Sequence, residues 1–275
     1  MARTDEALLT AARGGDREAL EQLLAAHQHR VFRFGVKMCG QEEDAKDVLQ
    51  ETLIAAARNI RDFRGASSVS TWLYTIARSF CIKKHRASKF APDHVDSLED
   101  TSGEAQSIAD PRRDPEESTA GEQVKKALQD AISALEPMYR EVLVLRDVEG
   151  LSAAEVGEIL NLSVEAVKSR LHRARVAVRQ QVAPLLGAPE PSGASLPPTQ
   201  CPEIVELFSK RLEGEISGDV CAEMEEHVKR CERCRARCDS LRATLSLCSQ
   251  SGEQVPLRVE RSVREALRRY LETHA

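Results

Sequence analysis

Apolar residues recur at three- and four-residue intervals along most of this chain, and this spacing constrains its fold more than any other feature. Such spacing places apolar side chains on one face of a helix. Early examples are Leu20, Leu23, Leu24, Val31 and Phe34, followed by Val48, Leu49, Thr52, Leu53 and Ala56. We find no convincing alternation of apolar and polar residues of the kind that a half-buried strand shows. The pattern predicts an all-α fold.

Two segments with few large apolar residues divide the chain into three helical units. Residues 91–120 contain nine acidic residues and two arginines, and residues 188–200 are rich in proline. Neither segment can bury enough apolar surface to offset the entropy lost on ordering its backbone, so both are predicted to be linkers. The predicted domains are therefore 1–90, 121–187 and 201–275.

Charge is segregated along the chain, although the net charge is only −5. Residues 58–89 carry eight basic residues and one Asp, and residues 164–179 carry five basic residues and one Glu. Two basic stretches separated by an acidic one indicate two contacts with a polyanion, most plausibly nucleic acid. The sequence has no membrane-length apolar run and no signal-peptide pattern at its start, so we expect a cytoplasmic protein.

The eight cysteines are unevenly distributed. Six lie in the last 75 residues, while Cys39 and Cys81 stand apart in apolar surroundings. A secreted protein would spread its disulfides through every domain, so the clustered thiols are predicted to hold a metal ion in a reducing compartment. The two isolated cysteines are predicted to be inert core residues.

The second predicted domain carries the signals of a helix-turn-helix. Ser152 and Glu155 form a capping box for a short helix, Asn161 suits the left-handed conformation of a tight turn, and Ser163 can cap a longer basic helix. In that helix the predicted DNA-facing residues are Ser163, Glu165, Lys168, Ser169, Arg170, His172, Arg173 and Arg175. Lys168 and Arg170 suit base edges, whereas Arg173 and Arg175 suit phosphates. A merely solvated basic face is the alternative interpretation.

Two blocks of the sequence resemble a known family in the same order. The stretch EGLSAAEVGEILNLSVEAVKSRLHRARVAVR resembles region 4 of extracytoplasmic-function (ECF) sigma factors, and QEEDAKDVLQETLIAAARNIRDFRGASSVSTWLYTIARSFCIKKHR resembles their region 2. The resemblance implies a dissociable transcription initiation subunit, not itself an enzyme, whose partners are core RNA polymerase and promoter DNA. The acidic linker then matches the segment that this family threads toward the polymerase active centre, although a solvated tether explains its composition equally well.

The resemblance also assigns residues in region 2. Asp44, Asp47, Gln50 and Glu51 match the helix that docks on the β′ clamp of the polymerase, and an exposed helix start explains such acids as well. The loop at residues 63–70 matches the one that captures an unstacked promoter base. The predicted DNA contacts of region 2 are Arg64, Trp72, Tyr74, Arg78, Lys83, Lys84 and Arg86. Trp72 taken alone is as consistent with a core residue.

The spacing of Cys201, His227, Cys231 and Cys234 resembles that of the zinc-binding anti-sigma domain. His227 and Cys231 lie four residues apart, which predicts one face of a single helix, with Cys234 a turn further on and Cys201 completing a tetrahedron from a distant helix. Thiolates and imidazole suit zinc, copper or cadmium. Cys221, Cys238 and Cys248 are further candidate ligands that exceed one tetrahedral site, and inert packing, a redox pair or a second metal site are the alternatives for them.

A sigma factor with a fused cysteine-rich tail resembles the CorE-like group of metal-responsive sigma factors. That group implies that metal binding to the tail makes the sigma factor competent and induces genes for metal efflux or detoxification. Two alternatives remain open: a tail that is a structural zinc module or thiol redox sensor, and a free-standing helix-turn-helix regulator. The final helix has an apolar face of Val259, Val263, Leu267, Tyr270 and Leu271, suited either to docking on the sigma domains or to packing within the tail.

Overall fold

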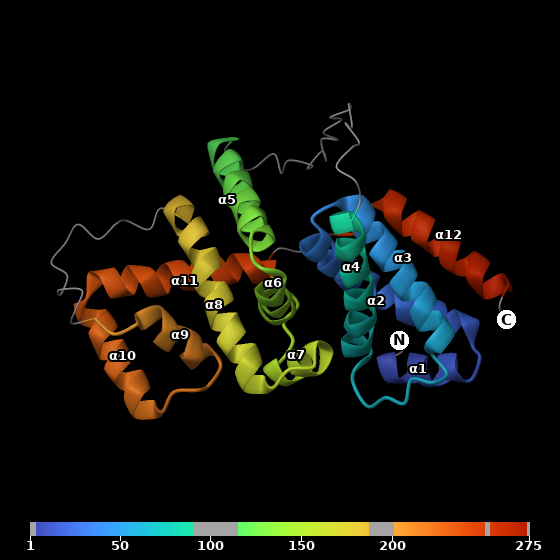
Figure 1. Cartoon of the computed structure of the whole chain (residues 1–275), viewed down its shortest axis with the longest axis horizontal. Coiled ribbons are helices and arrows are strands. Elements are labelled where there is room, and N and C mark those ends of the chain that lie inside the picture. The colour runs from blue at the N-terminus through green and yellow to red at the C-terminus, as the bar shows by residue number, and fades with distance from the viewer. Residues whose placement is uncertain (1–3, 91–114, 187–200, 251–253, 274–275) are drawn as a thin grey trace.

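The computed structural model describes residues 4–90, 115–186, 201–250 and 254–273, and within these ranges the regular structure is helical, with no strand. The predicted all-α fold is confirmed. The predicted linker at 188–200 and residues 91–114 of the acidic linker lie outside the described residues, whereas residues 115–120, also predicted as linker, are helical. The molecule is elongated, with two helical lobes side by side and a C-terminal tail that reaches both (Figure 1).

The first lobe consists of α1 (Asp5–Arg13), α2 (Arg17–Cys39), α3 (Glu42–Asn59) and α4 (Val69–Phe90). The Asp16 carboxylate accepts a hydrogen bond from the Ala19 amide and so caps the start of α2. Gly40 ends α2 with a φ of 80°, a conformation that favours glycine and turns the chain directly into α3. The apolar stripes predicted from the sequence face one another in the core of this lobe, where Leu23, Phe34 and Leu49 are fully buried.

The second lobe consists of α5 (Pro115–Ser133), α6 (Pro137–Leu143), a π-helical turn (Val144–Val148), α7 (Ala153–Leu160), α8 (Val164–Val182) and a 3-10 turn (Ala183–Leu186). The predicted capping box at Ser152 and Glu155, the left-handed Asn161 with a φ of 54°, and the Ser163 cap are all present. A Cβ at Gly157 would lie 2.7 Å from the Leu162 carbonyl oxygen, so the α7–α8 turn is too close for any other residue. The predicted helix-turn-helix is confirmed.

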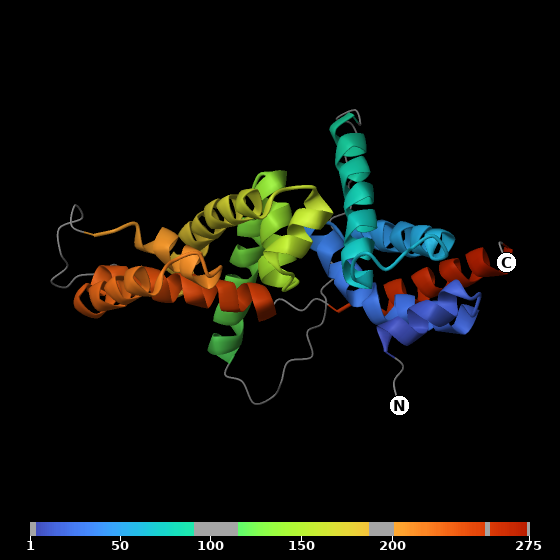
Figure 2. The same cartoon turned by 90° about the horizontal axis from the view of Figure 1, so that it is seen from below.

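The tail consists of α9 (Ile204–Leu212), α10 (Gly218–Arg230), α11 (Glu232–Gln250) and α12 (Leu257–Thr273). Helices α9 to α11 share a small core of their own, and α9 and α11 pack against α8. Helix α12 lies against α3, at the opposite end of the molecule from α10 (Figures 1 and 2). The tail therefore contacts both lobes.

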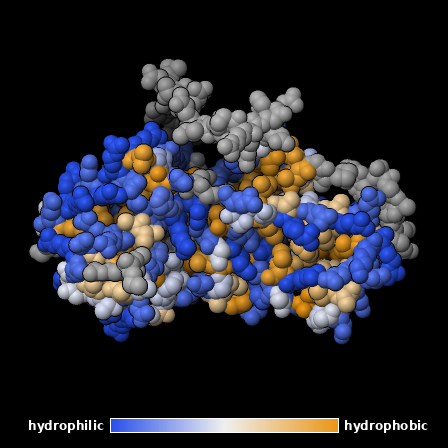
Figure 3. Space-filling view, turned by 180° about the vertical axis from the view of Figure 1, so that it is seen from behind, coloured by the Kyte–Doolittle hydropathy of each residue, from blue (hydrophilic) through white to orange (hydrophobic). Residues whose placement is uncertain are grey.

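Helix α12 turns its apolar face toward the first lobe. Val259, Val263 and Leu267 are at most 5% exposed and belong to the same core as α2 and α3. Of the two roles that the sequence left open for this helix, docking is the one observed. The face drawn in Figure 3 is a mosaic of hydrophilic and hydrophobic patches, so some apolar side chains remain at the surface although the stripes point inward.

Candidate metal centre and nucleic-acid interface

Four tail residues bring their ligand atoms together at the junction of α9, α10 and α11. Cys201 precedes α9, His227 lies in the last turn of α10, Cys231 follows that helix, and Cys234 lies in the first turn of α11. The predicted single helix through His227 and Cys231 is wrong, because Cys231 adopts an extended conformation (φ −114°, ψ 104°). Cys201 likewise lies outside any helix. The break lets two helices point their side chains at one centre.

The geometry of this group fits a tetrahedral ion. Its four ligand atoms lie within 4.8 Å of one another, and the Sγ atoms of Cys201 and Cys231 are 3.8 Å apart. Four ligands at a zinc–sulfur distance of about 2.3 Å place their sulfurs about 3.8 Å apart. His227 Nε2 lies 3.2 Å from Cys234 Sγ. The donor set and the spacing therefore suit zinc.

The surroundings of the group favour a bound cation. Cys231 and Cys234 are fully buried, and burial raises the pKa of the Cys234 thiol, with its hydrogen bonds to Cys201 and Cys231 acting in the same direction. A thiolate here therefore needs a positive charge beside it. Arg233 donates a hydrogen bond to Cys201 Sγ at 3.2 Å, an outer contact that orients this sulfur.

The three further candidate thiols lie apart from this group. Cys221 and Cys238 pack in the small tail core, whereas Cys248, at the far end of α11, lies in the larger core shared by the lobes. Burial raises the pKa of Cys238 to about 11 and that of Cys248 to about 12. Among the described residues, the group at Cys201 is the one in which three or more potential ligands converge.

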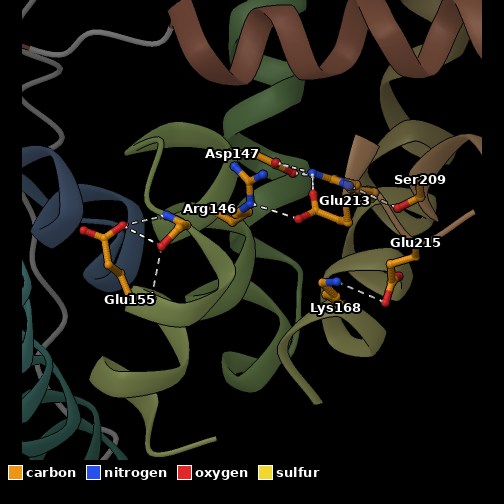
Figure 4. A network of polar contacts seen from close by, with 9 residues as sticks. Arg146, Asp147, Glu155, Lys168, Ser209, Glu213 and Glu215 are labelled. Carbon is orange, nitrogen blue, oxygen red and sulfur yellow. Dashed lines mark hydrogen bonds and ion pairs between the residues drawn. The ribbon is translucent and has the colours of Figure 1, made fainter. Parts of the chain in front are cut away.

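The recognition helix α8 is partly covered by the tail. Glu215 pairs with Lys168 at 3.3 Å, and Glu213 pairs with Arg146 at 3.2 Å and with Arg175 at 2.9 Å. Figure 4 shows these carboxylates reaching the second lobe from the segment that follows α9. Residues that the sequence predicts to bind DNA thus have carboxylate partners within the same chain.

The prediction that Arg175 faces DNA is wrong for this structure. The sequence places it on the outward face of α8, yet its side chain is only 3% exposed. It donates two hydrogen bonds to Asp147, one to Glu213 and one to Ser209. A buried guanidinium needs several acceptors, and the π-helical turn and the tail supply them. The helical period alone cannot show this, because the long side chain turns toward acceptors on the π-helical turn and the tail, which are distant in the sequence.

The other predicted residues of region 4 remain nearer the surface. Glu165, Ser169 and Arg173 are exposed, and Arg170 is half-buried. His172 is half-buried, and burial lowers its pKa, against the raising effect of nearby Glu206 on α9. Ser163 serves as the cap of α8.

Several predicted region 2 contacts lie at the seam between the two lobes. Tyr74 is 1% exposed and donates a hydrogen bond to Glu149 at 2.6 Å, and Arg78 pairs with Glu141 at 2.9 Å. Burial and the Glu149 carboxylate raise the pKa of Tyr74 far above its usual range. Arg33 forms two hydrogen bonds with the same Glu149. In this arrangement, which we call closed, carboxylates of the second lobe are the partners of these region 2 side chains.

The remaining predicted residues of region 2 are placed as follows. Trp72 stacks on Phe63 with ring centroids 4.6 Å apart, and Lys83 lies over the Phe80 ring. Lys84 pairs with Asp44 at 2.8 Å and with Asp47 at 2.6 Å, so a predicted DNA contact neutralises two predicted polymerase contacts. Arg64 and Glu51 are exposed and Gln50 is half-buried, while the side chain of Arg86 lies outside the described residues.

The helix α12 joins the α3 side of the first lobe through contacts at its rim. Arg258 pairs with Glu42 at 2.6 Å and Arg268 with Glu21 at 3.2 Å. The Arg58 guanidinium lies over the Tyr270 ring. Glu42 begins the same helix that carries the predicted polymerase contacts.

The sequence analysis missed the carboxylates that pair with the predicted DNA-binding residues of the two sigma regions. Glu141 and Glu149 lie in the second lobe, and Glu213 and Glu215 in the tail. Glutamates are common on exposed helix faces, and nothing in their local sequence marks them. Their role depends on which surfaces meet in the fold.

Comparison with known proteins agrees with this architecture. Residues 23–90 match the family described as Sigma-70 region 2, residues 125–178 match Sigma-70, region 4, and residues 201–235 match a family described as "putative zinc-finger". The ECF RNA polymerase sigma factor SigW of Bacillus subtilis is 34% identical over 173 residues, which is 61% of this chain and 91% of SigW. The ECF RNA polymerase sigma-E factor of Haemophilus influenzae is 31% identical over 186 residues, 66% of this chain and 97% of that protein.

A solved structure of CnrH in complex with the cytosolic domain of CnrY is 26% identical, covers 64% of this chain and 95% of that chain, and has a TM-score of 0.48. The two sigma regions in order, with the helix-turn-helix in the second, define an RNA polymerase sigma factor. The chain belongs to the ECF sigma factor family and carries a cysteine-rich, zinc-finger-like domain at its C-terminal side. None of the described helices is long and apolar enough to cross a membrane.

Proposed function

We propose that this ECF sigma factor is regulated in cis by its own tail, which holds the two sigma regions closed until a transition metal alters the tail. In the closed state the tail competes with promoter DNA for region 4 and with core polymerase for region 2. Zinc at Cys201, His227, Cys231 and Cys234 maintains this state. A softer ion such as copper or cadmium opens it, and the genes it controls encode metal efflux or detoxification.

The contact of Glu213 and Glu215 with the cations of region 4 is the observation that carries this proposal. The three basic residues that they pair with are Arg146, Lys168 and Arg175. A carboxylate satisfies a guanidinium as a DNA phosphate does, so both cannot occupy the same group at once. The same segment also covers part of the α8 surface that would enter the major groove.

The seam between the lobes supports the same closed state. Tyr74 and Arg78, which resemble promoter contacts of region 2, have Glu149 and Glu141 as partners. Binding of promoter DNA through these side chains requires the lobes to separate. The tail spans both lobes and therefore opposes that separation.

The metal group is connected to these contacts by short stretches of rigid helix. Cys201 lies three residues before α9, whose other end leads into Glu213, and Cys234 lies in the first turn of α11. Helix α11 contacts α8, where Arg179 donates a hydrogen bond to Ser240 Oγ at 2.7 Å. A bound ion supplies the charge that the buried thiolates need, and an ion with a different preferred ligand number favours a different arrangement of α9 to α11.

In vitro transcription with core polymerase tests the proposal. The zinc-loaded full chain should support little transcription, a chain ending at Gly187 should be active, and copper(I) or cadmium should raise transcription by the full chain toward that of the truncated one. Equal transcription by both chains, whatever ion is supplied, contradicts regulation by the tail. A full chain that is silent with every ion, beside an active truncated chain, assigns the tail a structural zinc role.

Oxidant challenge separates the remaining alternatives. A tail that senses redox state should ignore cadmium, an ion that does not change its oxidation state, and its response to peroxide should persist in Cys39→Ser, a substitution remote from the tail. A free-standing DNA-binding regulator should fail to bind core polymerase, and the region 2 match argues against it.

A further inference from the structure

Cys39 and Cys81 form a pair of thiols in region 2, remote from the metal group of the tail. Cys39 is the last residue of α2 and Cys81 lies in α4, 42 positions later, yet their Sγ atoms are 3.6 Å apart. Neither is in a disulfide. The prediction that both are core residues is confirmed, since Cys81 belongs to the apolar core and Cys39 packs against it, but the two do not stand apart, and no local spacing indicates their contact.

The two thiols differ in environment. Cys39 is half-buried, whereas Cys81 is 1% exposed. Contact with Cys81, and then the nearby Lys84 and Arg140 cations, lower the pKa of Cys39, against the opposite effects of burial and Asp44. Contact with Cys39 and burial raise the pKa of Cys81 above its usual range. Cys39 is thus the more accessible thiol and the better able to form a thiolate.

The position of Cys39 allows the pair to close. A disulfide bond is about 2.05 Å long, so the two sulfurs need to approach by about 1.5 Å. Cys39 occupies the end of α2, immediately before the turn at Gly40, where the helix has no following turn to resist a small displacement. Cys81 in the interior of α4 can remain in place.

We propose that Cys39 and Cys81 are an oxidant-responsive pair that forms a reversible disulfide when the chain meets a hydroperoxide. The Cys39 thiolate attacks the peroxide, so that an S–O bond forms, the O–O bond breaks, and the departing oxygen leaves as water or an alcohol after taking a proton. The Cys81 sulfur then attacks the resulting sulfenic acid. The S–S bond forms, the S–O bond breaks, and the hydroxyl leaves as water with the Cys81 proton. Two thiols are oxidised and one hydroperoxide is reduced.

The two cysteines lie beside the contacts that region 2 makes with α6 of the second lobe in the closed state. The Met38 carbonyl, next to Cys39, accepts a hydrogen bond from Arg140 of α6 at 3.0 Å. Arg78, one turn before Cys81, pairs with Glu141 of the same helix. The disulfide therefore ties together the two elements of region 2 that hold α6. Region 2 would respond to oxidants independently of any metal in the tail.

Peptide mapping of the zinc-loaded full chain tests the pair directly. After treatment with hydrogen peroxide, alkylation and proteolysis, mass spectrometry should find the peptides of Cys39 and Cys81 linked, and a reductant should separate them. The matched control, Cys221→Ser, makes the same exchange in the tail and should leave the link unchanged. Absence of the link, at a peroxide dose that oxidises free cysteine in the same tube, overturns the proposal.

Two further measurements test the order of attack. In Cys81→Ser, Cys39 should accumulate as a sulfenic acid that a 1,3-diketone traps, whereas Cys39→Ser should leave Cys81 unoxidised. Equal oxidation of Cys81 in that variant overturns the assigned order. Alkylation of the unsubstituted chain avoids any effect of substitution on folding, and Cys39 should react with a maleimide at least about tenfold faster than Cys81.

Discussion

The tail contacts the two sigma regions by different chemistry. On region 4 it places a carboxylate among buried cations, with Glu213 5% exposed and Arg175 3% exposed. On region 2 it lays down an apolar stripe, Val259, Val263 and Leu267, whose ion pairs lie at the rim, where the Arg258 side chain is 75% exposed. The segment after α9 thus makes a buried ionic contact with region 4, beside the apolar packing of α11 there, and α12 makes a buried apolar contact with region 2.

The two contacts therefore have different roles: one excludes promoter DNA from region 4, and the other holds the tail on region 2. Desolvation of a buried ion pair offsets much of its attraction, so the pairs of Glu213 with Arg146 and Arg175, the Glu213 network, contribute little net stability. They nevertheless occupy guanidinium groups that DNA phosphates would otherwise bind. Burial of apolar surface contributes about 25 cal/mol for each Å². Helix α12 therefore holds the tail on region 2 mainly by burial of apolar surface, and the segment after α9 determines what the tail excludes from region 4.

Metal removal should have the largest effect, because it should disrupt the contact of the tail with region 4 and leave the contact of α12 with region 2 in place. Structural zinc supplies about 10 kcal/mol or more of folding free energy to small zinc domains. Without the ion, α9 to α11 should lose their amide protection in hydrogen exchange, whereas α12, held by the core of the first lobe, should keep its protection. Cys234→Ser should have the same effect as a chelator.

Cys221→Ser is the matched control for this experiment, since this thiol lies in the same tail core but outside the four-ligand group. It should bind one zinc ion per chain, as the unsubstituted chain should. Equal loss of protection in α12 on chelation would show that the tail unfolds as one cooperative unit, so that its contacts with region 4 and region 2 are not independent.

Glu213→Gln should have the next largest effect. Arg146 and Arg175 both lose a charged partner, and breaking a buried pair costs about 3 kcal/mol. If that free energy moves the chain toward the open state, apparent affinity for promoter DNA in the presence of core polymerase should rise about 100-fold, as fluorescence anisotropy would measure.

Asp239→Asn removes an exposed carboxylate of the tail whose partner, Arg242, is 65% exposed. It should change the same affinity by less than about twofold. An unchanged affinity for Glu213→Gln would mean that the network does not limit access to region 4.

Much of the fold follows from local signals, and most of the closed arrangement does not. The capping box at Ser152, the left-handed Asn161 and the apolar stripes depend on neighbours a few residues away, and the structure has all of them. The pairing of Glu149 with Arg33, 116 positions apart, depends on which surfaces of two lobes meet. The spacing of the four ligands predicted that they converge. The helix break at Cys231 was missed, because four-residue spacing is the same whether or not the helix continues through the cysteine.

Leu267→Ala should weaken the apolar contact of α12 with region 2. Leu267 is 5% exposed, and loss of a buried leucine side chain of this kind costs about 2 kcal/mol. Apparent affinity for core polymerase should rise about 30-fold, while binding of promoter DNA by region 4 changes less. Leu257→Ala, on the same helix but 71% exposed, is the control and should leave both unchanged.

Arg258→Gln should have the smallest effect, because it tests the rim of the same contact. Arg258 and Glu42 have side-chain exposures of 75% and 39%, and solvent screens such an exposed pair so that it contributes little. Polymerase affinity should rise by only about twofold, and 1 M salt should abolish the difference from the unsubstituted chain, since the screening length there is about 3 Å. The Glu213 network, shielded from solvent, should keep most of its effect in the same salt. A large, salt-resistant effect of Arg258→Gln would instead place the anchoring of α12 in its ion pairs rather than in its apolar stripe.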